Sequence, residues 1–542
     1  MLNVFAPRVD LAKHQHTSLP VLVWFHAGEF VYGTANDKES AFPFFANNSV
    51  VVVTVQNRIG PFGFLALPGL RSSGNLGMLD QRFALEWVQA NIRAFGGDPS
   101  RVTIKGESSG ATSVAWHLTS CQSWPLFQRA ILQSPGMDQD KNRSAAETNA
   151  NFVLAVLRTC GVPSCVGPSG AYVRVAHQGL VFKSMDVIKI SINLTETQAR
   201  KWCDLQKTCS GFDWDRSNGQ WTFVRNFTGT WAFWQQSPSL VAFMKGGPED
   251  PSVQLACLMN ASLEQLVNAP MYLPFGDTNI KDGWGPVVDG VSASVSLIDR
   301  IRHGESAPNV DILLGSNLDE GTFFDQDPTT PIANLPCEAD HDAFEMTLRR
   351  QYGLNTSAAV AVSSAYSSLQ GPVPSCRCSN APGSAHWNSA GVRAAGDYAF
   401  ACPTRYAAQK WAEGNRTIFY YQFSQTPAYS YNVPSEDLHC RGAFHGSDVP
   451  YSWLDRDELK SRKDLWLSER MACYWRHFIE SGDPNKGSCG NVSLPQWLPH
   501  TSKNDFGLEL SGNGITLMRE PYKRQCSSLR PFTALPEEVL LV

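Results

Sequence analysis

Short runs of almost continuous apolar residues recur along the chain. They cover residues 20–25, 49–55, 101–105, 310–314 and 417–423. A strand buried on both faces of a parallel sheet has this pattern, whereas a strand with one face in water alternates apolar and polar residues. We therefore predict that these runs are strands of one buried, mostly parallel sheet.

Stretches with helical periodicity lie between the predicted strands. From residue 79 to residue 95 apolar positions recur every three or four residues, and the sequence GGDP at 96–99 interrupts the pattern. Strand, helix and strand in succession favour right-handed βαβ units. The predicted fold class is therefore α/β, with a central, mostly parallel sheet flanked by helices.

One segment departs from this alternation. Residues 167–246 are rich in tryptophan and polar residues and contain the pair Cys203 and Cys209. The sequence TETQ at 195–198 is typical of a capping box at the start of a helix, and a strand is predicted from Ser210. We interpret the segment as a small α+β module inserted into a domain formed by residues 1–166 and 247–542. The alternative is a long irregular excursion of the main fold, although structureless loops of this length are uncommon.

Composition excludes several classes of protein. With 43% hydrophobic and 11% aromatic residues among 542, the chain can bury a large core, which disordered and fibrous proteins do not. The net charge of −5 gives no reason to expect nucleic acid as a partner, because nucleic-acid-binding surfaces are usually basic. No run of the sequence approaches the ~20 apolar residues that a membrane-spanning helix needs.

Cysteine content and glycosylation acceptors favour the secretory pathway. The chain has 14 cysteines, more than is usual in a reducing compartment. Asn-x-Ser/Thr acceptors begin at Asn47, Asn142, Asn193, Asn226, Asn260, Asn355, Asn415 and Asn491. The first residues nevertheless have neither the charged start nor the apolar core of a signal peptide.

The sequence GESSG at 106–110 matches the G-x-S-x-G motif of a nucleophilic serine. It lies between the strand that ends at Lys105 and an apolar segment, 111–118, that can form a helix. In such a turn the serine has a strained backbone, and the flanking glycines leave room for it. Ser108 is therefore the candidate nucleophile, although the motif alone also arises by chance.

A nucleophilic serine needs a histidine base and an orienting acid, which follow it in the order acid, histidine in α/β-hydrolases. His445 lies in a loop of small residues, 442–448, and the alternative for it is an ordinary solvated histidine. Asp319 and Glu320 follow the strand at 310–314, at the edge of the sheet where such folds keep their sites. Position alone does not choose between these two carboxylates.

Backbone donors for an oxyanion are expected in the loop HAGEF at 26–30, after the strand at 20–25. Gly28 allows the backbone of this loop to approach a substrate closely. The chain thus contains a candidate nucleophile, base, acid and oxyanion-binding loop.

Four separated segments resemble the type B carboxylesterase and cholinesterase family. They are VLVWFHAGEFVYG at 21–33, residues 74–111 with DQRFALEWVQANIRAFGGDPSRVTIKGESSGA, GSNLDEGTFF at 315–324 and GAFHGSDVPYSW at 442–453. The resemblance covers nearly the whole chain outside the predicted insertion, and it implies an α/β-hydrolase fold and a serine esterase activity.

The resemblance also implies roles for individual residues. Ser108 corresponds to the nucleophile, Glu320 rather than Asp319 to the acid, and His445 to the base. Members of the family that act in adhesion typically lose the serine, whereas this chain keeps all three residues. Their retention favours catalysis.

For the oxyanion hole the resemblance implies the N–H groups of Gly28, Glu29 and Ser109. Glu107 and Asp448 occupy positions that are usually acidic in the family and that line or brace its site. The family's usual three glycines are Ala-Gly-Glu at 27–29 in this chain. A carboxylate beside a forming oxyanion would repel it, so we expect Glu29 to point away from the site.

The resemblance bears on the N-terminus and on the insertion as well. Family members carry a signal peptide, edge strands and a cysteine pair ahead of the segment that matches residues 2–7, so we expect this chain to be truncated. A family disulfide corresponds to Cys160 and Cys257, which flank the insertion. With Cys203 and Cys209, the insertion resembles the small PAN or apple modules, which bind proteins or carbohydrates.

The sequence therefore predicts a secreted serine carboxylesterase that hydrolyses small-molecule or lipid esters through an acyl-enzyme. No metal or organic cofactor is needed, no nucleic acid is expected, and a protein or carbohydrate is the expected ligand of the inserted module. The alternative is a non-catalytic adhesion or recognition protein on the same fold, and hydrolysis of an amide or a polymer ester also stays open. The sequence does not determine the oligomeric state.

Overall fold

The computed structural model of the chain contains two compact units. The first unit comprises Met1–Asn57, Met78–Gln139 and Val295–Val542, and the second comprises Arg58–Gly77 and Asp140–Ser294. The structure describes residues 1–7, 18–36, 45, 50–67, 74–137, 140–144, 146–147, 150, 154, 172–179, 187–190, 209–215, 220–225, 235–245, 251–262, 266, 284–324, 332–351, 354–367, 378, 386–414, 416–430, 433–434 and 437–529.

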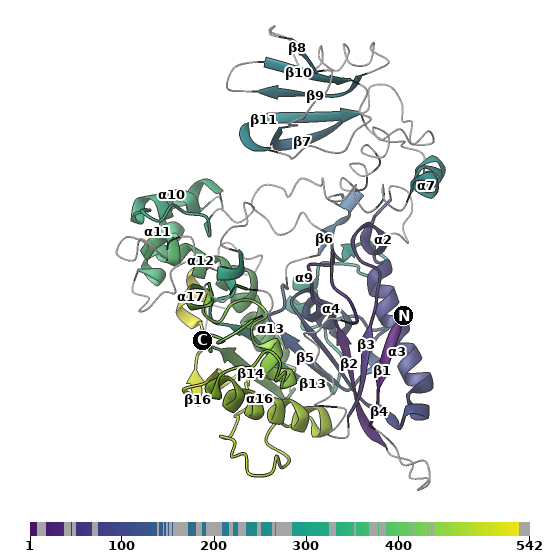
Figure 1. The fold of residues 1–542 in the computed structure, drawn as a ribbon, viewed down its shortest axis with the longest axis vertical. Helices are drawn as coiled ribbons and strands as arrows, with labels where there is room; N and C mark the ends of the chain where they lie inside the picture. Colours follow the sequence, from purple (N-terminus) through teal and green to yellow (C-terminus); the bar gives the residue numbers. More distant parts are fainter. Residues whose placement is uncertain are drawn as a thin grey trace. The chain divides into compact units, whose positions relative to one another are not determined.

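A nine-stranded sheet is the centre of the first unit (Figure 1). Its order is β1-β3-β2-β4-β5-β13-β14-β15-β16, and only the pairs β1–β3 and β15–β16, at its two edges, are antiparallel. The strands are β1 (Leu2–Phe5), β2 (Leu19–Phe25), β3 (Val51–Val55), β4 (Gly97–Glu107), β5 (Arg129–Gln133), β13 (Asp311–Asn317), β14 (Ile418–Phe423), β15 (Phe506–Ser511) and β16 (Gly514–Arg519). The predicted mostly parallel sheet is confirmed.

The boundary between the first long helix and β4 differs from the prediction. Helix α3 (Leu76–Asn91) continues as a 3-10 turn (Ile92–Phe95), and Gly96, with a φ of 82°, ends it. β4 then begins at Gly97, which pairs with β2, so the residues 98–99 belong to the strand and not to a breaker. The error has a physical cause, because one left-handed glycine is enough to end a helix.

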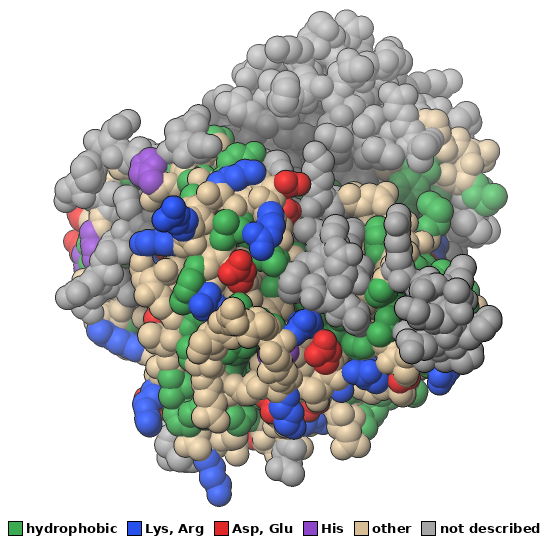
Figure 2. Space-filling model, turned by 60° about the horizontal axis from the view of Figure 1, so that its bottom comes forward, with side chains coloured by type: hydrophobic (Ala, Val, Ile, Leu, Met, Phe, Trp, Pro, Cys, Tyr) green, Lys and Arg blue, Asp and Glu red, His purple; other side chains and the backbone are tan. Residues whose placement is uncertain are grey.

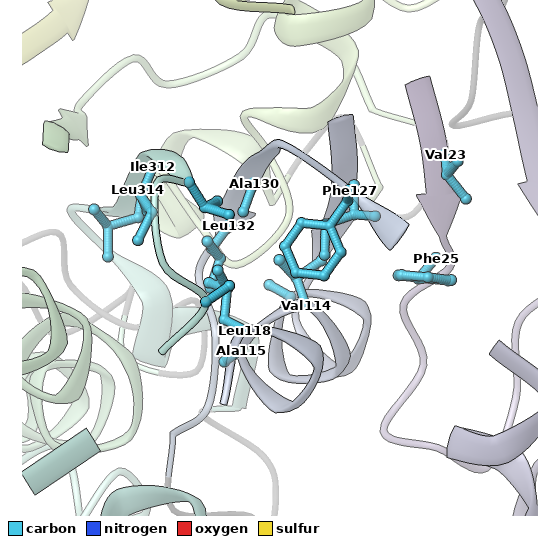
Figure 3. Packing of buried hydrophobic residues seen from close by; sticks show 14 of the residues in the cluster. Val23, Phe25, Val114, Ala115, Leu118, Phe127, Ala130, Leu132, Ile312 and Leu314 are labelled. Atoms are coloured by element: carbon cyan, nitrogen blue, oxygen red, sulfur yellow. The ribbon is translucent and has the colours of Figure 1, made fainter. Parts of the chain in front are cut away.

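Helices cover both faces of this sheet. On β2, Val23 and Phe25 belong to one buried cluster and Trp24 to the other, as the alternation of side chains along a strand requires. The first cluster packs against α3, α4 (Ser109–Leu118), α9 (Leu297–Arg302) and α13 (Cys402–Ala412), and Figure 3 shows part of it. The second packs against α15 (Val449–Trp453) and α16 (Arg462–Ser481). This burial holds the carboxyl ends of the parallel strands in fixed positions.

The second unit contains an antiparallel five-stranded sheet of order β7-β11-β9-β10-β8. Its strands are β7 (Tyr172–Gly179), β8 (Val187–Ile190), β9 (Cys209–Asp215), β10 (Gln220–Arg225) and β11 (Gln235–Lys245). They fall within the predicted insertion 167–246, and β9 is the strand predicted from Ser210. The predicted helix at 195–201 and Cys203 lie outside the described residues. The likeness to a PAN or apple module stays a prediction.

Several disulfides lie within the described part of the chain. They join Cys337 to Cys378, Cys402 to Cys526 and Cys473 to Cys489. Cys257, in α7 (Pro251–Asn260), is also disulfide-bonded, but its predicted partner Cys160 lies outside the described residues.

Charged side chains, helices and glycosylation acceptors can be located on the described part of the chain. On the face shown in Figure 2, the visible Lys, Arg, Asp and Glu side chains are dispersed among polar and apolar ones rather than gathered by sign. Among the described helices, none is long and apolar enough to cross a membrane. The predicted glycosylation acceptors Asn142, Asn260, Asn355 and Asn491 are exposed.

Candidate active site

The predicted strand-turn-helix around Ser108 is present. β4 ends at Glu107, α4 starts at Ser109, and Ser108 between them has a φ of 51° and a ψ of −123°. A Cβ on Gly106 would lie 2.3 Å from the carbonyl oxygen of Gly110, and a Cβ on Gly110 would lie 2.2 Å from that of Phe25. Both glycines are therefore required by close backbone contacts, and the strained turn carries Ser108 at the tip.

Glu320 and His445 form a hydrogen-bonded pair. Glu320 lies in a 3-10 turn, η7 (Glu320–Phe324), just after β13, and its Oε2 is 2.6 Å from Nδ1 of His445. The other carboxylate oxygen, Oε1, accepts hydrogen bonds from the Ser134 hydroxyl at 2.5 Å and the Asn317 N–H at 2.6 Å. Because the carboxylate can only accept, Nδ1 carries a proton and donates it. Both side chains are buried.

Asp319, the other carboxylate of this turn, has different partners. Its Oδ1 is 2.5 Å from the Arg393 guanidinium, and its Oδ2 accepts the N–H of Ala443 at 2.9 Å. The N–H of Asp319 in turn donates to the carbonyl of Ala443. Asp319 thus connects its own turn to the loop that carries His445, but it does not contact the imidazole.

Aromatic rings and a second carboxylate surround the imidazole of His445. The ring centroid of Phe400 is 4.2 Å from that of His445, and the centroid of Phe324 is 5.4 Å away. Phe400 lies on a π-helical turn, Asp397–Ala401. On the other side, Oε1 of Glu107 lies 3.4 Å from Nε2 of His445. The rings exclude water from the imidazole, while Glu107 adds a negative charge next to it.

These neighbours change the protonation of His445. Burial disfavours the charged imidazolium, but the charges of Glu107 and Glu320 favour it more strongly and raise the pKa of His445 from 6.5 to about 9. A histidine with this pKa binds a proton at neutral pH and acts as a base only after losing it.

Asp448 is the third carboxylate near His445 and is completely buried. Its Oδ2 accepts hydrogen bonds from the Gln133 amide at 2.8 Å and the Tyr421 hydroxyl at 2.7 Å. Burial raises the pKa of Asp448, and these two hydrogen bonds act in the opposite direction. Asp448 is held by this network and braces the start of α15 next to the His445 loop.

The loop after β2 has the backbone of a tight turn. Gly28 and Glu29 have φ values of 111° and 52°, and the carbonyl of Gly28 accepts the N–H groups of Val31 and Tyr32. A Cβ on Gly28 would lie 2.4 Å from the carbonyl oxygen of Tyr32. Glu29 is exposed to solvent.

A cavity of about 280 Å³ connects these parts. Ser108, His445, Glu107 and Gly28 all line it, so the elbow, the histidine loop and the loop after β2 share one space. The remaining wall includes aromatic and acidic side chains, namely Tyr32, Phe323, Tyr429, Tyr451, Glu458 and Asp464. Among the described hydrogen bonds, none joins Ser108 to His445, whose Nε2 has no hydrogen-bond partner. Such bonds are often long in unliganded enzymes and shorten when substrate binds.

Comparison with known proteins gives the family. A model of the carboxylesterase family matches residues 1–165 and 232–529, which is most of the chain. The chain belongs to the carboxylesterase family. Within this carboxylesterase-family chain, the internal stretch that is not matched, 166–231, overlaps the predicted insertion. The family's α/β-hydrolase fold agrees with the nine-stranded sheet.

A relative within the family is the acetylcholinesterase of Bungarus fasciatus. It is 52% identical to this chain over 138 residues, which are 25% of this chain. The chain matches 22% of the length of that acetylcholinesterase, or about a fifth.

Sequence reasoning on this carboxylesterase-family chain missed the residues that support the candidate site. Ser134, which has a φ of 51° and donates to Glu320, and Gln133 lie at the end of β5, a strand that was not predicted. Asn317 lies within the family-like segment 315–324, but no sequence pattern indicated that its N–H donates to Glu320. Lys105 was treated as part of an apolar strand, yet it is a completely buried polar side chain.

Proposed function

We propose that the chain is a serine carboxylesterase that hydrolyses esters through an acyl-enzyme. Ser108 is the nucleophile, His445 the general base and acid, and Glu320 the carboxylate that orients the imidazole. The observation that carries the proposal is the 2.6 Å bond between Glu320 and His445, formed beside a strained Ser108 that lines the same cavity. Family membership and the acetylcholinesterase relative support the same reaction class.

The geometry supports a two-step reaction. Nε2 of His445 accepts the proton of Ser108 Oγ while Oγ bonds to the ester carbonyl carbon. The tetrahedral intermediate then expels the alcohol, which takes its proton from His445, and leaves an acyl group on Ser108. Water repeats the sequence with the acyl-enzyme, so that the acid is released and the serine is regenerated.

Backbone amides stabilise the negative oxygen of the intermediate in this proposal. The donors are the N–H groups of Gly28, Glu29 and Ser109. Ser109 is the first residue of α4, where an N–H has no partner inside the helix. The close contact of Gly110 with β2 keeps the start of α4 next to the loop that holds Gly28.

Substrates are proposed to be small-molecule or lipid esters, since the cavity is lined by aromatic rings and is large enough for an acyl group. The reaction needs no metal or organic cofactor, because side chains supply the nucleophile and the proton transfer and backbone amides supply the oxyanion donors. The disulfides and the exposed glycosylation acceptors support a location in the secretory pathway.

Replacement of the candidate nucleophile tests the proposal. We expect Ser108→Ala to abolish turnover of a p-nitrophenyl acyl ester and labelling by an organophosphonate. Ser109→Ala is the matched control: it removes a neighbouring hydroxyl, retains the backbone N–H and should still be labelled. Label that persists in Ser108→Ala would show that the nucleophile is misassigned. A folded wild-type protein that takes no label would favour the non-catalytic recognition protein instead.

A further inference from the structure

A buried lysine lies directly beneath the candidate site. Lys105 is on β4, two residues before Glu107, and its side chain has no exposure to solvent. Its ammonium nitrogen is 3.9 Å from the ring centroid of Trp453 and 5.4 Å from that of Trp24. Burying an ammonium group is expensive unless it is paired or hydrogen-bonded. The mechanism proposed above does not use this lysine, so its presence needs another explanation.

A chain of hydrogen bonds leads from Lys105 toward the site. Nζ of Lys105 donates to the Ser452 hydroxyl at 2.8 Å. The single proton of that hydroxyl has two acceptors within reach, the Val449 carbonyl oxygen at 2.9 Å and the Gln133 amide oxygen at 3.2 Å. The amide nitrogen of Gln133 donates to Asp448 at 2.8 Å. When the Ser452 proton faces Gln133, each donor points in the same direction, from the lysine to the carboxylate. Hydrogen bonds arranged in this way polarise one another.

This chain of hydrogen bonds, the relay from Lys105 to Asp448, ends where several carboxylates lie close together. The described charged groups that face His445 are Glu107 from β4, Glu320 from η7 and Asp448 from the start of α15. Asp448 is itself held by Gln133, Tyr421 and, at 3.4 Å, Asn317, none of which carries a positive charge.

Among the described residues, the partly buried cation Arg393 also lies near these groups, but it is already paired. Arg393 binds Asp319 on the far side of the Glu320 turn, where Asp397 also lies, hydrogen-bonded to Tyr366. Lys105 is therefore the described cation that stands behind Asp448.

We infer that Lys105 is the counter-charge of the candidate site: a positioning residue, linked to Asp448 through Ser452 and Gln133, that offsets the carboxylates around His445. This inference rests on the proposed function, because it assigns a role in the proton transfer of His445. Burial lowers the pKa of Lys105 well below 10.5, while the charge of Asp448 favours the ammonium form, as do the two indole faces.

The inference predicts a direction for the pH dependence. A positive charge near His445 opposes its protonation, so the loss of that charge makes the imidazolium more stable. In Lys105→Met we expect the acid limb of kcat/KM to move to higher pH by about half a unit or more, which is roughly threefold lower activity on that limb. Ser452→Ala interrupts the relay but keeps the lysine, and we expect a smaller shift in the same direction. Lys503→Met, at an exposed position, should keep the wild-type limb.

The experiment measures pH profiles of p-nitrophenyl ester turnover together with hydrogen–deuterium exchange at the imidazole carbon of His445, read by mass spectrometry. The exchange gives the pKa of His445 without requiring turnover. If the pKa of His445 is the same in wild type and in Lys105→Met, the inference is overturned. If Lys105→Met does not fold, an unchanged pKa of His445 in Ser452→Ala overturns the inference. A wild-type protein without turnover, whose His445 titration still responds to these substitutions, would overturn the proposed function alone.

Discussion

Two turns at the carboxyl edge of the sheet provide the candidate reacting groups by different means. The turn after β4 positions Ser108 through its backbone, because Gly106 and Gly110 pack against main-chain atoms and force the strained φ at the serine. The turn after β13 positions Glu320 through its side chain, which Asn317 holds from the end of β13 and Ser134 holds from the end of β5. The first turn is therefore fixed by backbone packing that glycine permits, and the second by hydrogen bonds to a carboxylate side chain.

The largest effect is expected from changing the backbone of the first turn. In Gly110→Ala, the new Cβ would collide with the carbonyl oxygen of Phe25, which lies 2.2 Å from its ideal position. We expect a loss of about 3 kcal/mol or more in the free energy of unfolding and no detectable esterase activity. Chemical denaturation and ester turnover measure both. Gly304→Asn, at a left-handed position with open space around it, should unfold like wild type. Wild-type turnover in Gly110→Ala would contradict the backbone account.

The second turn should respond differently at its two carboxylates. Glu320→Gln cannot accept the Nδ1 proton in the same way and should lower kcat by about 10⁴ with little change in stability. Asp319→Asn removes the charge that Arg393 contacts directly and should cost about 3 kcal/mol of stability, while the folded fraction keeps most of its activity. Steady-state kinetics and thermal denaturation of both variants separate the roles. If Asp319→Asn lost activity and Glu320→Gln lost stability instead, the roles assigned to the two carboxylates would be reversed.

A moderate effect is expected at Glu107, where the strand of the first turn reaches the histidine. The charge of Glu107 raises the pKa of His445, so Glu107→Gln should lower that pKa and move the acid limb of kcat/KM to lower pH by about one unit. The sign follows because His445 is a base only when neutral, and activity rises as pH passes its pKa. A limb that moves to higher pH would show that Glu107 does not stabilise the imidazolium.

The same pKa has a consequence for stability. Since the folded protein holds the His445 proton more tightly than the unfolded chain, this contribution is complete below pH 6.5 and is lost as pH rises through about 9. We therefore expect the melting temperature to fall over this range while activity rises. Melting curves of wild type and His445→Gln between pH 6 and 10 measure the contribution, and parallel curves would contradict it.

The smallest effect is expected in the loop after β2. Glu29 is exposed and has a φ of 52°, a conformation that glycine adopts without strain. Glu29→Gly should change kcat/KM by less than about threefold and leave stability the same or slightly higher. A tenfold or larger rise in kcat/KM would show that the carboxylate acts on the oxyanion after all.

The contrast between the two turns explains what the sequence could predict. The strands read from apolar runs are present, and the GESSG turn could be inferred because the glycines that permit it are adjacent in sequence. The choice between Asp319 and Glu320 could not be made from spacing, because it depends on Arg393 and His445, which are more than seventy residues away. Resemblance to the family indicated Glu320, and the hydrogen bond to His445 agrees with it.

Buried polar groups were the least predictable part of the site. Lys105 interrupts an apolar strand by a single residue, and only the arrangement in space reveals that Ser452 accepts its hydrogen bond and that two indole rings cover it. Asp448 was indicated by the resemblance, but its partners Gln133 and Tyr421 come from separate strands. Such networks are tertiary, so a single sequence does not encode them in any local pattern.

A crystal structure of the protein after reaction with a p-nitrophenyl phosphonate tests the central claim most directly. We expect phosphorus bonded to Oγ of Ser108, the phosphonyl oxygen facing the N–H groups at positions 28, 29 and 109, and Nε2 of His445 within hydrogen-bonding distance of Oγ. Phosphorus on another residue, or an imidazole of His445 turned away from Ser108 in the adduct, would contradict the account.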